Sequence, residues 1–242
     1  MTLIKRKIRL GVHNYLIIDL TLPLSLSQEG YQEDFKPTRS VFSDIERDGW
    51  HHYTHELGDH SFHPHCDAPN HFQAERQEIG MDMYDLSWSF HQAFLIDLAG
   101  SEGSKRHQGI RFLTNVTKAH LEPFSELLGK TSAVVVRTGY DKWIEINHQH
   151  HPELIPFLTR DAAEYIGSFN NIKVIGIDSL TVDAFGLQVS HQALKDKMIV
   201  EALVHLYEIP DGRGDRFDLQ TSPIRIAGAT GGPVVAYAYI AL

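Results

Sequence analysis

What the sequence lacks already restricts the class of protein. The chain of 242 residues has a single cysteine, Cys66, which excludes an intrachain disulfide and a thiolate-rich metal cluster. Any metal site must therefore use nitrogen and oxygen ligands. No run of 18 apolar residues occurs, and residues 1–6 lack the apolar core of a signal peptide. We expect a cytoplasmic protein with no membrane partner.

Basic residues are also scarce. The chain has 22 Lys and Arg against 31 Asp and Glu, a formal net charge of -9. Nucleic acids and anionic membranes attract proteins chiefly through Lys and Arg patches, so the sequence predicts no nucleic-acid partner and favours a small-molecule substrate. No repeat, low-complexity tract or Pro/Ser-rich linker divides the chain, which predicts one domain over residues 1–242.

Histidine, by contrast, is abundant, with 16 residues. It is the commonest metal ligand and the side chain that titrates nearest neutral pH. The excess directs attention to metal chemistry without defining a site.

Apolar, β-branched runs recur along the chain and predict strands, several of them buried on both faces. They cover residues 15–20, 93–98, 132–137, 172–177, 198–204 and 234–240. Helical patterns cover residues 117–128 and 159–166, and each ends at a glycine, Gly129 or Gly167, suited to a left-handed C-cap. Thr159 is a natural N-cap, and Pro123 predicts that the first helix starts late or splits. This alternation predicts an α/β fold with a mixed, β-rich sheet and a few helices.

The densest group of reactive side chains lies within residues 60–71, which contain His60, His63, His65, Asp67 and His71. In an extended segment alternate side chains share a face, so His63, His65 and Asp67 point one way and Cys66 the other. Pro69 stops regular pairing, and the turn after it can bring His71 back to the same pocket. A carboxylate between imidazoles can bridge two divalent ions or complete one catalytic site.

Two simpler interpretations stand beside this one. The histidines could be polar residues of a solvated loop. Cys66 could be a nucleophile beside His65 and Asp67, but its position on the opposite strand face favours a packed, structural thiol.

The segment Asp67-Ala-Pro-Asn-His71, preceded by His65, resembles the signature His-x-Gly-Thr-His-x-Asp-x-Pro-x-His of the cyclase-like metal hydrolases. That group contains bacterial kynurenine formamidases, isatin hydrolases and some polyketide cyclases. Further landmarks follow in the family's order. They are residues 18–21, 137–143, 175–183, His191 followed by Glu201, and 228–233.

The resemblance implies a metal site of His65, Asp67, His71, His191 and Glu201, with zinc or manganese as the ion. It also implies that His71 and Glu201 transfer protons. The signature's first histidine corresponds to Ser61, and its Gly-Thr pair to His63-Pro64. Either His60 or His63 could supply the missing ligand. The implied fold is the swivelling β/β/α type, assembled as a homodimer or homotetramer.

The reaction implied by the resemblance is hydrolysis, in which metal-activated water attacks an amide or formamide carbonyl. Substrates would be aryl formamides such as N-formylkynurenine, or a small cyclic amide. One alternative is a metal-assisted cyclase or dehydratase acting on a polyketide-like substrate. Another is a degenerate, non-catalytic binding protein, because Ser61 and His63-Pro64 depart from the signature.

Other features allow two interpretations each. Residues 228–233 could cradle a phosphate but lack a P-loop lysine, which favours a tight turn near the active site. Residues 147–151 could bind a surface metal or form a polar loop. Asp178 and Asp183 could orient metal-bound histidines or accept hydrogen bonds from turn amides. Trp88 and Phe90 could line a substrate pocket or pack in the core.

Overall fold

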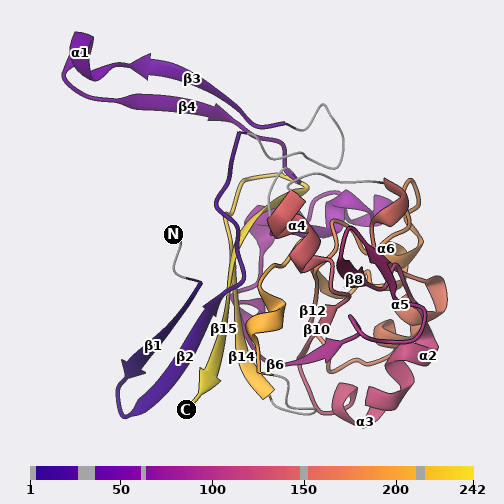
Figure 1. The fold of residues 1–242 in the computed structure, drawn as a ribbon. Coiled ribbons are helices and arrows are strands. Elements are labelled where there is room, and N and C mark those ends of the chain that lie inside the picture. The colour runs from indigo at the N-terminus through magenta and orange to yellow at the C-terminus, as the bar shows by residue number, and fades with distance from the viewer. Residues whose placement is uncertain (1–3, 27–35, 61–63, 148–151, 211–215) are drawn as a thin grey trace.

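The strands form one large mixed sheet (Figure 1). A computed structural model describes residues 4–26, 36–60, 64–147, 152–210 and 216–242. The order of the nine strands is β1-β2-β15-β14-β6-β10-β12-β13-β5. Their bounds are β1 Lys5–Leu10, β2 His13–Asp19, β5 His65–Asp67, β6 Phe90–Asp97, β10 Ala133–Arg137, β12 Val174–Ile177, β13 Met198–Glu201, β14 Arg216–Pro223 and β15 Gly231–Ala241.

Seven of these strands close into a ring. The first residues of β15 pair with β5, and the rest of its length pairs with β14 on one side and β2 on the other. Strands β6, β10, β12 and β13 run parallel, whereas β14, β15 and β5 pair antiparallel with their neighbours. The hairpin of β1 and β2 extends the sheet beyond the ring.

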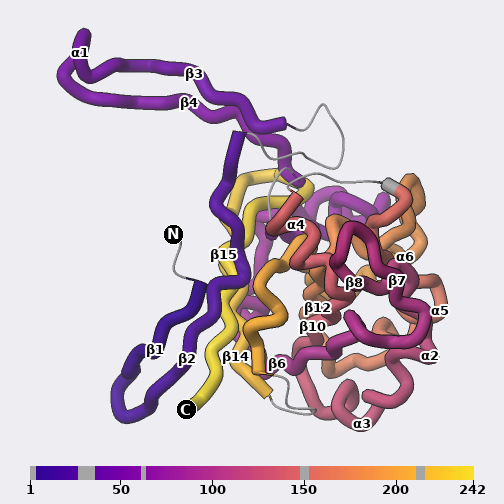
Figure 2. Tube along the Cα trace, in the orientation of Figure 1, coloured from indigo at the N-terminus to yellow at the C-terminus, as the bar shows by residue number. Residues whose placement is uncertain are grey.

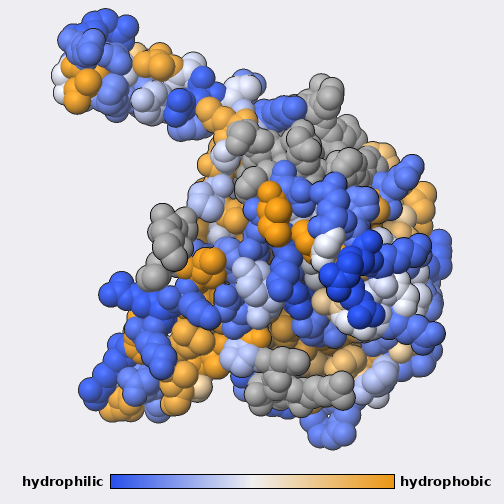
Figure 3. All heavy atoms as spheres, viewed as in Figure 1, coloured by the Kyte–Doolittle hydropathy of each residue, from blue (hydrophilic) through white to orange (hydrophobic). Residues whose placement is uncertain are grey.

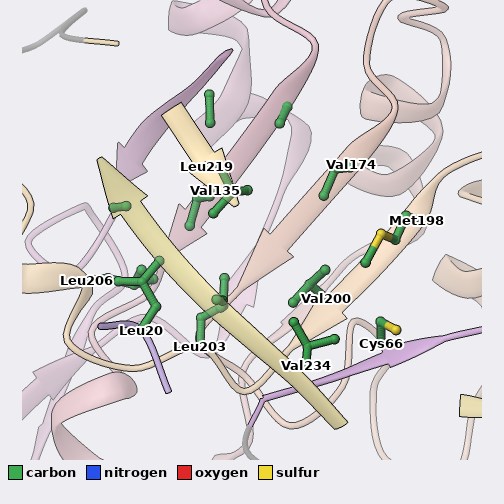
Figure 4. Close-up of a cluster of buried hydrophobic side chains, with 14 of the residues drawn as sticks. Leu20, Cys66, Val135, Val174, Met198, Val200, Leu203, Leu206, Leu219 and Val234 are labelled. Carbon is green, nitrogen blue, oxygen red and sulfur yellow. The ribbon is translucent and has the colours of Figure 1, made fainter. Parts of the chain in front are cut away.

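Every strand of the ring sends apolar side chains into one cluster, which therefore fills its interior. Figure 4 shows Val135, Val174, Val200, Val234 and Cys66 converging there from five strands. The thiol of Cys66 is buried and lies 3.8 Å from the sulfur of Met81. Burial raises its pKa well above the ordinary value, so the sulfur is held as a packed thiol, as the alternation predicted.

Helices cover the opposite face of the parallel strands, as the tube in Figure 2 also shows. The helices on this face are α2 Lys118–Leu121, α3 Ser125–Leu128, α5 Arg160–Gly167 and α6 Val189–Ala193. Leu121, Leu128 and Ile166 pack there against outward-facing valines and isoleucines of β10 and β12. Helix α4, Asp141–Asn147, packs in a separate cluster with Phe112 and Tyr140. Parallel strands buried on both faces explain why the sequence shows continuous apolar runs. In the described part of the chain, no helix is long and apolar enough to cross a membrane.

The predicted fold class is confirmed, and all six predicted strands are present within a few residues of their expected ends. The largest difference is at residues 198–204, where the strand ends at Glu201. Ala202 adopts a left-handed conformation, with φ of 58°, and turns the chain away from the sheet. Pro123 splits the first predicted helix into α2, a 3-10 turn over Glu122–Phe124, and α3.

The predicted left-handed glycine caps are wrong. Gly129 has φ of -69°, because the chain continues the right-handed turn after α3. Gly167 is the last residue of α5, and Ser168 takes the cap position. A Cβ atom at Gly167 would lie 2.6 Å from the carbonyl oxygen of Ala193, so the glycine allows α5 to approach α6 closely. Thr159 does precede α5, but its hydroxyl donates to the carbonyl of Val116.

Three small two-stranded sheets do not follow from the apolar pattern. Strands β3 (Thr38–Ser43) and β4 (His52–Glu56) flank α1 (Ile45–Asp48) in a separate two-stranded sheet. Strands β7 (Lys105–His107) and β8 (Ile110–Phe112) pair with each other, and the two-residue strands β9 (Asn115–Val116) and β11 (Phe157–Leu158) form a third small sheet. These strands carry many polar or exposed residues and give little apolar signal.

Asp178, at the end of β12, fixes the chain after β10. Its carboxylate accepts hydrogen bonds from the backbone amides of Thr138, Gly139 and Asp141 and from the Thr138 hydroxyl.

Asp178→Ala should lower the free energy of unfolding by roughly 3 kcal/mol, because buried donors lose their acceptor. Urea unfolding measures the loss. Asp218→Asn, at an exposed position of β14, is the control, and a loss no larger than that of the control would contradict the assignment.

Candidate metal centre

The candidate site is built on the antiparallel pairing of β5 with β13. His65 lies directly opposite Glu201, and Asp67 lies opposite Ile199. Nε2 of His65 is 3.2 Å from Oε2 of Glu201. Alternation sends Cys66 and Val200 to the interior of the ring, so His65, Asp67 and Glu201 share the other face. Two short strands thus place an imidazole and two carboxylates side by side.

Asp67 is the centre of the group. Its carboxylate is only 1% exposed. Oδ2 lies 2.9 Å from Nε2 of His191, whereas Oδ1 lies 3.1 Å from Nδ1 of His60 and 3.8 Å from Nε2 of His65. Oδ1 nevertheless makes no hydrogen bond of normal geometry within the described residues. A buried carboxylate oxygen in this position is suited to bind a cation.

His191 comes from α6, far along the chain, and is oriented from behind by Asp183. Its Nδ1 lies 2.6 Å from Oδ2 of Asp183, while its Nε2 faces Asp67 and lies 3.5 Å from Oε1 of Glu201. Asp183 also accepts hydrogen bonds from the amides of Ser190 and His191. A carboxylate behind an imidazole is the usual arrangement behind a metal-binding histidine, because it fixes ring orientation and tautomer. Asp183 therefore accepts turn amides and also orients the His191 ring, whereas metal binding by His191 stays a prediction.

His71 reaches the group from the 3-10 helix η2 (Pro69–His71), which begins at the proline expected to end the strand. Its ring centre is 4.1 Å from that of His60 and 5.9 Å from that of His191. Burial lowers the pKa of His71 to about 4. The ring is therefore neutral at neutral pH and offers a lone pair to a metal ion or to a proton.

His60 is held by the turn that precedes β15. Its Nε2 lies 3.2 Å from the hydroxyl oxygen of Thr230, and the neighbouring carboxylate of Asp59 accepts from the amide and hydroxyl of Thr230. A Cβ atom on Gly231 would collide with the His60 ring, so only glycine leaves room for it. Of the two replacements offered for the first histidine of the signature, His60 lies in the site. His63 lies outside the described residues, as does Ser61.

The charges of the group favour a cation. Burial alone would raise the pKa of Asp67, but the hydrogen bond from His191 and the positive charge of His191 and His60 hold that pKa well below its usual value. For Glu201, burial and then the charge of Asp67 raise the pKa. Two buried carboxylates therefore compete for positive charge. A divalent ion satisfies both better than a single proton on His191 can.

The structure brings together six of the predicted ligands. Two overlapping sets, His60 with His65 and Asp67, and Asp67 with His71 and His191, each have potential ligand atoms within 4.8 Å of one another. Glu201 touches both sets through His65 and His191. The mixed nitrogen and oxygen donors fit zinc or manganese. Their assignment as ligands stays a prediction.

The remaining candidates lie elsewhere or play supporting parts. Asp178 accepts turn amides, and none of the hydrogen bonds that it makes within the described residues comes from a histidine. Of residues 228–233, the first three form the turn beside His60 and the last three begin β15. Trp88 packs on the interior cluster, but Phe90 is 64% exposed, so the prediction of core packing is wrong for Phe90, which faces outward at the edge of β6. Residues 148–151 of the histidine-rich segment lie outside the described residues.

Sequence reasoning missed the groups that hold the ligands in place. Asp59 and Thr230 anchor His60, and the amide of Val182 donates to Oε1 of Glu201 at 2.6 Å. No regular spacing in the sequence connects Asp59, Thr230 or Val182 with the histidines. The proximity of Asp59 to His60 was the only available signal.

Asp67→Asn should abolish tight binding of zinc or manganese, because the substitution removes the charge shared by both ligand sets. Binding should weaken by more than the roughly 10–100-fold that follows loss of a hydrogen-bonded neighbour. Isothermal titration of the metal-stripped protein measures this effect. Asp196→Asn, whose side chain is 78% exposed, is the control, and equal affinity in the two variants would exclude Asp67 as a ligand.

Asp183→Asn tests the group behind His191. We expect metal affinity to fall by roughly 10–100-fold with the fold retained, because the ring loses a partner that fixes its orientation and raises its basicity. Metal titration with circular dichroism separates the two effects. If this variant binds the metal as tightly as the wild type, Asp183 does no more than accept hydrogen bonds at the start of α6.

Known proteins were compared with the chain as a whole. Residues 18–184 match the family described as "Putative cyclase"; this segment includes His60, His65, Asp67 and His71. Cyclase-like protein 2 from Oryza sativa subsp. japonica is 27% identical over 174 residues, which are 70% of this chain. The chain spans 58% of the length of that relative.

Solved structures show the same fold at low identity. An isatin hydrolase bound to the product analogue thioisatinate is 21% identical, with a TM-score of 0.74 over 93% of this chain and 92% of that one. Isatin hydrolase A from Labrenzia aggregata, bound to benzyl benzoate, is 17% identical, with a TM-score of 0.73 over 93% and 94%. A potential metal-dependent hydrolase with cyclase activity is 19% identical, with a TM-score of 0.68 over 92% and 98%. The family match covers more than half of the residues of this chain, and the chain therefore belongs to the putative cyclase family.

Proposed function

We propose that the chain is a metal-dependent hydrolase in which activated water attacks an amide or formamide carbonyl. The observation that carries the proposal is the buried carboxylate of Asp67, surrounded by His60, His65 and His191, with Oδ1 lacking a normal hydrogen bond. Such a group is costly to bury unless a cation completes it. Similarity to isatin hydrolases in fold supports the choice of hydrolysis.

A zinc or manganese ion held by His60, His65, Asp67, His191 and Glu201, with His71 as a further ligand, would supply Lewis-acid chemistry that activates water and polarises a carbonyl. The protein fixes the donors before substrate arrives. Asp183 holds the His191 ring, Val182 holds the Glu201 carboxylate, and Thr230 holds the His60 ring. This preorganisation limits the rearrangement that binding requires.

His71 and Glu201 are the proposed proton carriers. His71 is neutral above a pKa of about 4, so a ring nitrogen can accept a proton from water and return it to a leaving nitrogen. Burial and then the charge of Asp67 raise the pKa of Glu201 above its ordinary value, which favours uptake of a proton by its carboxylate. The two side chains approach the Asp67 carboxylate from different elements, η2 and β13.

The substrate class follows from the resemblance and from the similar structures. Aryl formamides such as N-formylkynurenine and small cyclic amides such as isatin present a carbonyl next to an aromatic ring. Phe72, whose ring centre is 5.2 Å from that of His191, lies beside the ligands. The Phe72 ring is only 8% exposed and belongs to the hydrophobic core, so it packs against the His191 ring from the protein interior.

His71→Ala should lower kcat for the best substrate by roughly 100-fold or more, since it removes a proton carrier. The assay uses protein stripped by a chelator and reloaded with zinc or manganese, against N-formylkynurenine, isatin and simple amides, lactams and lactones. His13→Asn, at an exposed position of β2, is the control.

Two outcomes would overturn the proposal. If the reloaded protein holds metal but cleaves none of these substrates, the cyclase or dehydratase alternative takes its place. If neither metal is retained, a non-catalytic binding protein is the better description.

A further inference from the structure

His71 lies in a segment that no sheet holds in place. Residues 69–76 form two short 3-10 helices, η2 and η3 (Ala74–Arg76), and none of these residues belongs to a strand. The candidate ligands of β5 and β13 are fixed by strand pairing. Short 3-10 turns have poorer hydrogen-bond geometry, and irregular segments place side chains less precisely than strands or helices do. Contacts outside the backbone of the segment must therefore fix His71.

Gln192, the residue after His191 in α6, makes one such contact. Its side-chain Nε2 donates to the carbonyl oxygen of Phe72, the residue after His71. The ring of Phe72 lies 5.2 Å from that of His191, so a polar and an aromatic contact join the same two segments.

Gln73 makes the corresponding contact in the opposite direction. Its side-chain Nε2 donates to the carbonyl oxygen of Lys195, just after α6, at 2.6 Å. Its Oε1 accepts from Nη1 of Arg76 at 3.4 Å. Gln73 is only 1% exposed, and a buried amide is costly unless it is hydrogen-bonded. Burial therefore favours the bonded position of the side chain.

The remaining contacts between the two segments lie nearer to solvent. Gln192 and Lys195 are exposed, and Figure 3 shows mostly hydrophilic side chains around the helices on the right of the view. Arg76 and Asp196 form an ion pair at 3.8 Å, but the side chain of Asp196 is 78% exposed, so this pair contributes little. The two glutamine contacts, one of them from a buried side chain, are the main polar link.

A crossed pair of hydrogen bonds restricts motion more than either bond does alone. With one bond, the η2 segment can pivot about the remaining contact and carry His71 away from α6. With two, it is held at two points. On its other side, Asn70 donates from Nδ2 to the carbonyl of Gly228, in the turn beside His60, at 3.3 Å. The segment is thus held between α6 and that turn.

We propose that Gln73 and Gln192 are positioning residues, which together hold the ring of His71 at the candidate metal centre. His71, His191 and Asp67 form one ligand set, whose potential ligand atoms lie within 4.8 Å of one another. The crossed bonds keep this set assembled before an ion binds. The inference rests on the proposed function, because it gives the two glutamines a part in metal binding.

The first test uses the metal-stripped chain. Methionine removes the donor of each glutamine and nearly keeps its length. Gln73→Met with Gln192→Met should speed amide hydrogen exchange of residues 70–76 at least about 10-fold, because the segment then opens locally. Asn171→Leu is the control, since Asn171 also donates its side-chain amide to two backbone carbonyls, outside the candidate site. Exchange of residues 70–76 in the control should match the wild type.

The second test uses cobalt(II) as the probe, because its visible absorption reports the geometry of its ligands. In the double variant the affinity for cobalt(II) should fall roughly 10–100-fold and the absorption bands should change, as expected when a ligand loses the contacts that orient it. Each single variant should lose much less, since one bond remains. Asn171→Leu should keep the affinity and the bands of the wild type. Circular dichroism and thermal unfolding show that each variant is folded.

Three results would contradict this role of the glutamines. If residues 70–76 of the double variant exchange no faster than in Asn171→Leu, the glutamines do not hold the segment. If exchange is faster but cobalt(II) affinity and bands stay as in the wild type, they hold the segment without positioning His71. If exchange is faster and the wild-type chain itself binds no cobalt(II), the proposed function fails, and the glutamines are a structural link only.

Discussion

The three-residue strand β5 is the constraint on which both the ring and the candidate site depend. It pairs with β13 on one edge and with β15 on the other, and without it the ring is open. The same pairing sets His65 against Glu201. A shift of one residue would turn His65 and Asp67 toward the apolar interior and bring Cys66 to the site. The packing of Cys66 beside Met81 and Val200 therefore holds the register of the ligands.

Burying the carboxylates of the site costs folding free energy. Hydrogen bonds from neighbouring backbone amides offset part of that cost. Glu201 accepts the amide of Val182, and Asp183 accepts the amides at the start of α6. Ala202 adopts a left-handed conformation directly after Glu201, which for a residue with a Cβ atom costs about 1–2 kcal/mol. The strained residue, the buried carboxylates and the oxygen without a normal hydrogen bond all belong to the paired strands β5 and β13 or directly follow them. This concentration is typical of a functional site and not of an ordinary sheet edge.

Strict alternation over three residues was enough to predict that His65 and Asp67 face the site and Cys66 the core. Continuous apolar runs predicted the buried strands for the same local reason. His191 and Glu201 could be linked to Asp67 only through family resemblance, since more than 120 residues separate them and no local periodicity connects the two segments. The glycine caps were mispredicted because Gly167 serves close helix packing, a tertiary requirement. The hairpin of β3 and β4 escaped prediction because histidines and charged residues interrupt its apolar pattern.

His60 connects the two parts of the molecule that the sequence leaves unrelated. It lies four residues beyond β4, and Asp59 and Thr230 fix the segment that joins β4 to the candidate ligands. The side chain of His60 is 20% exposed, against 6% or less for His65, Asp67, His191 and Glu201. Burial therefore holds His60 less firmly than these four, and its place beside Asp67 depends more on the contacts of Asp59 and Thr230.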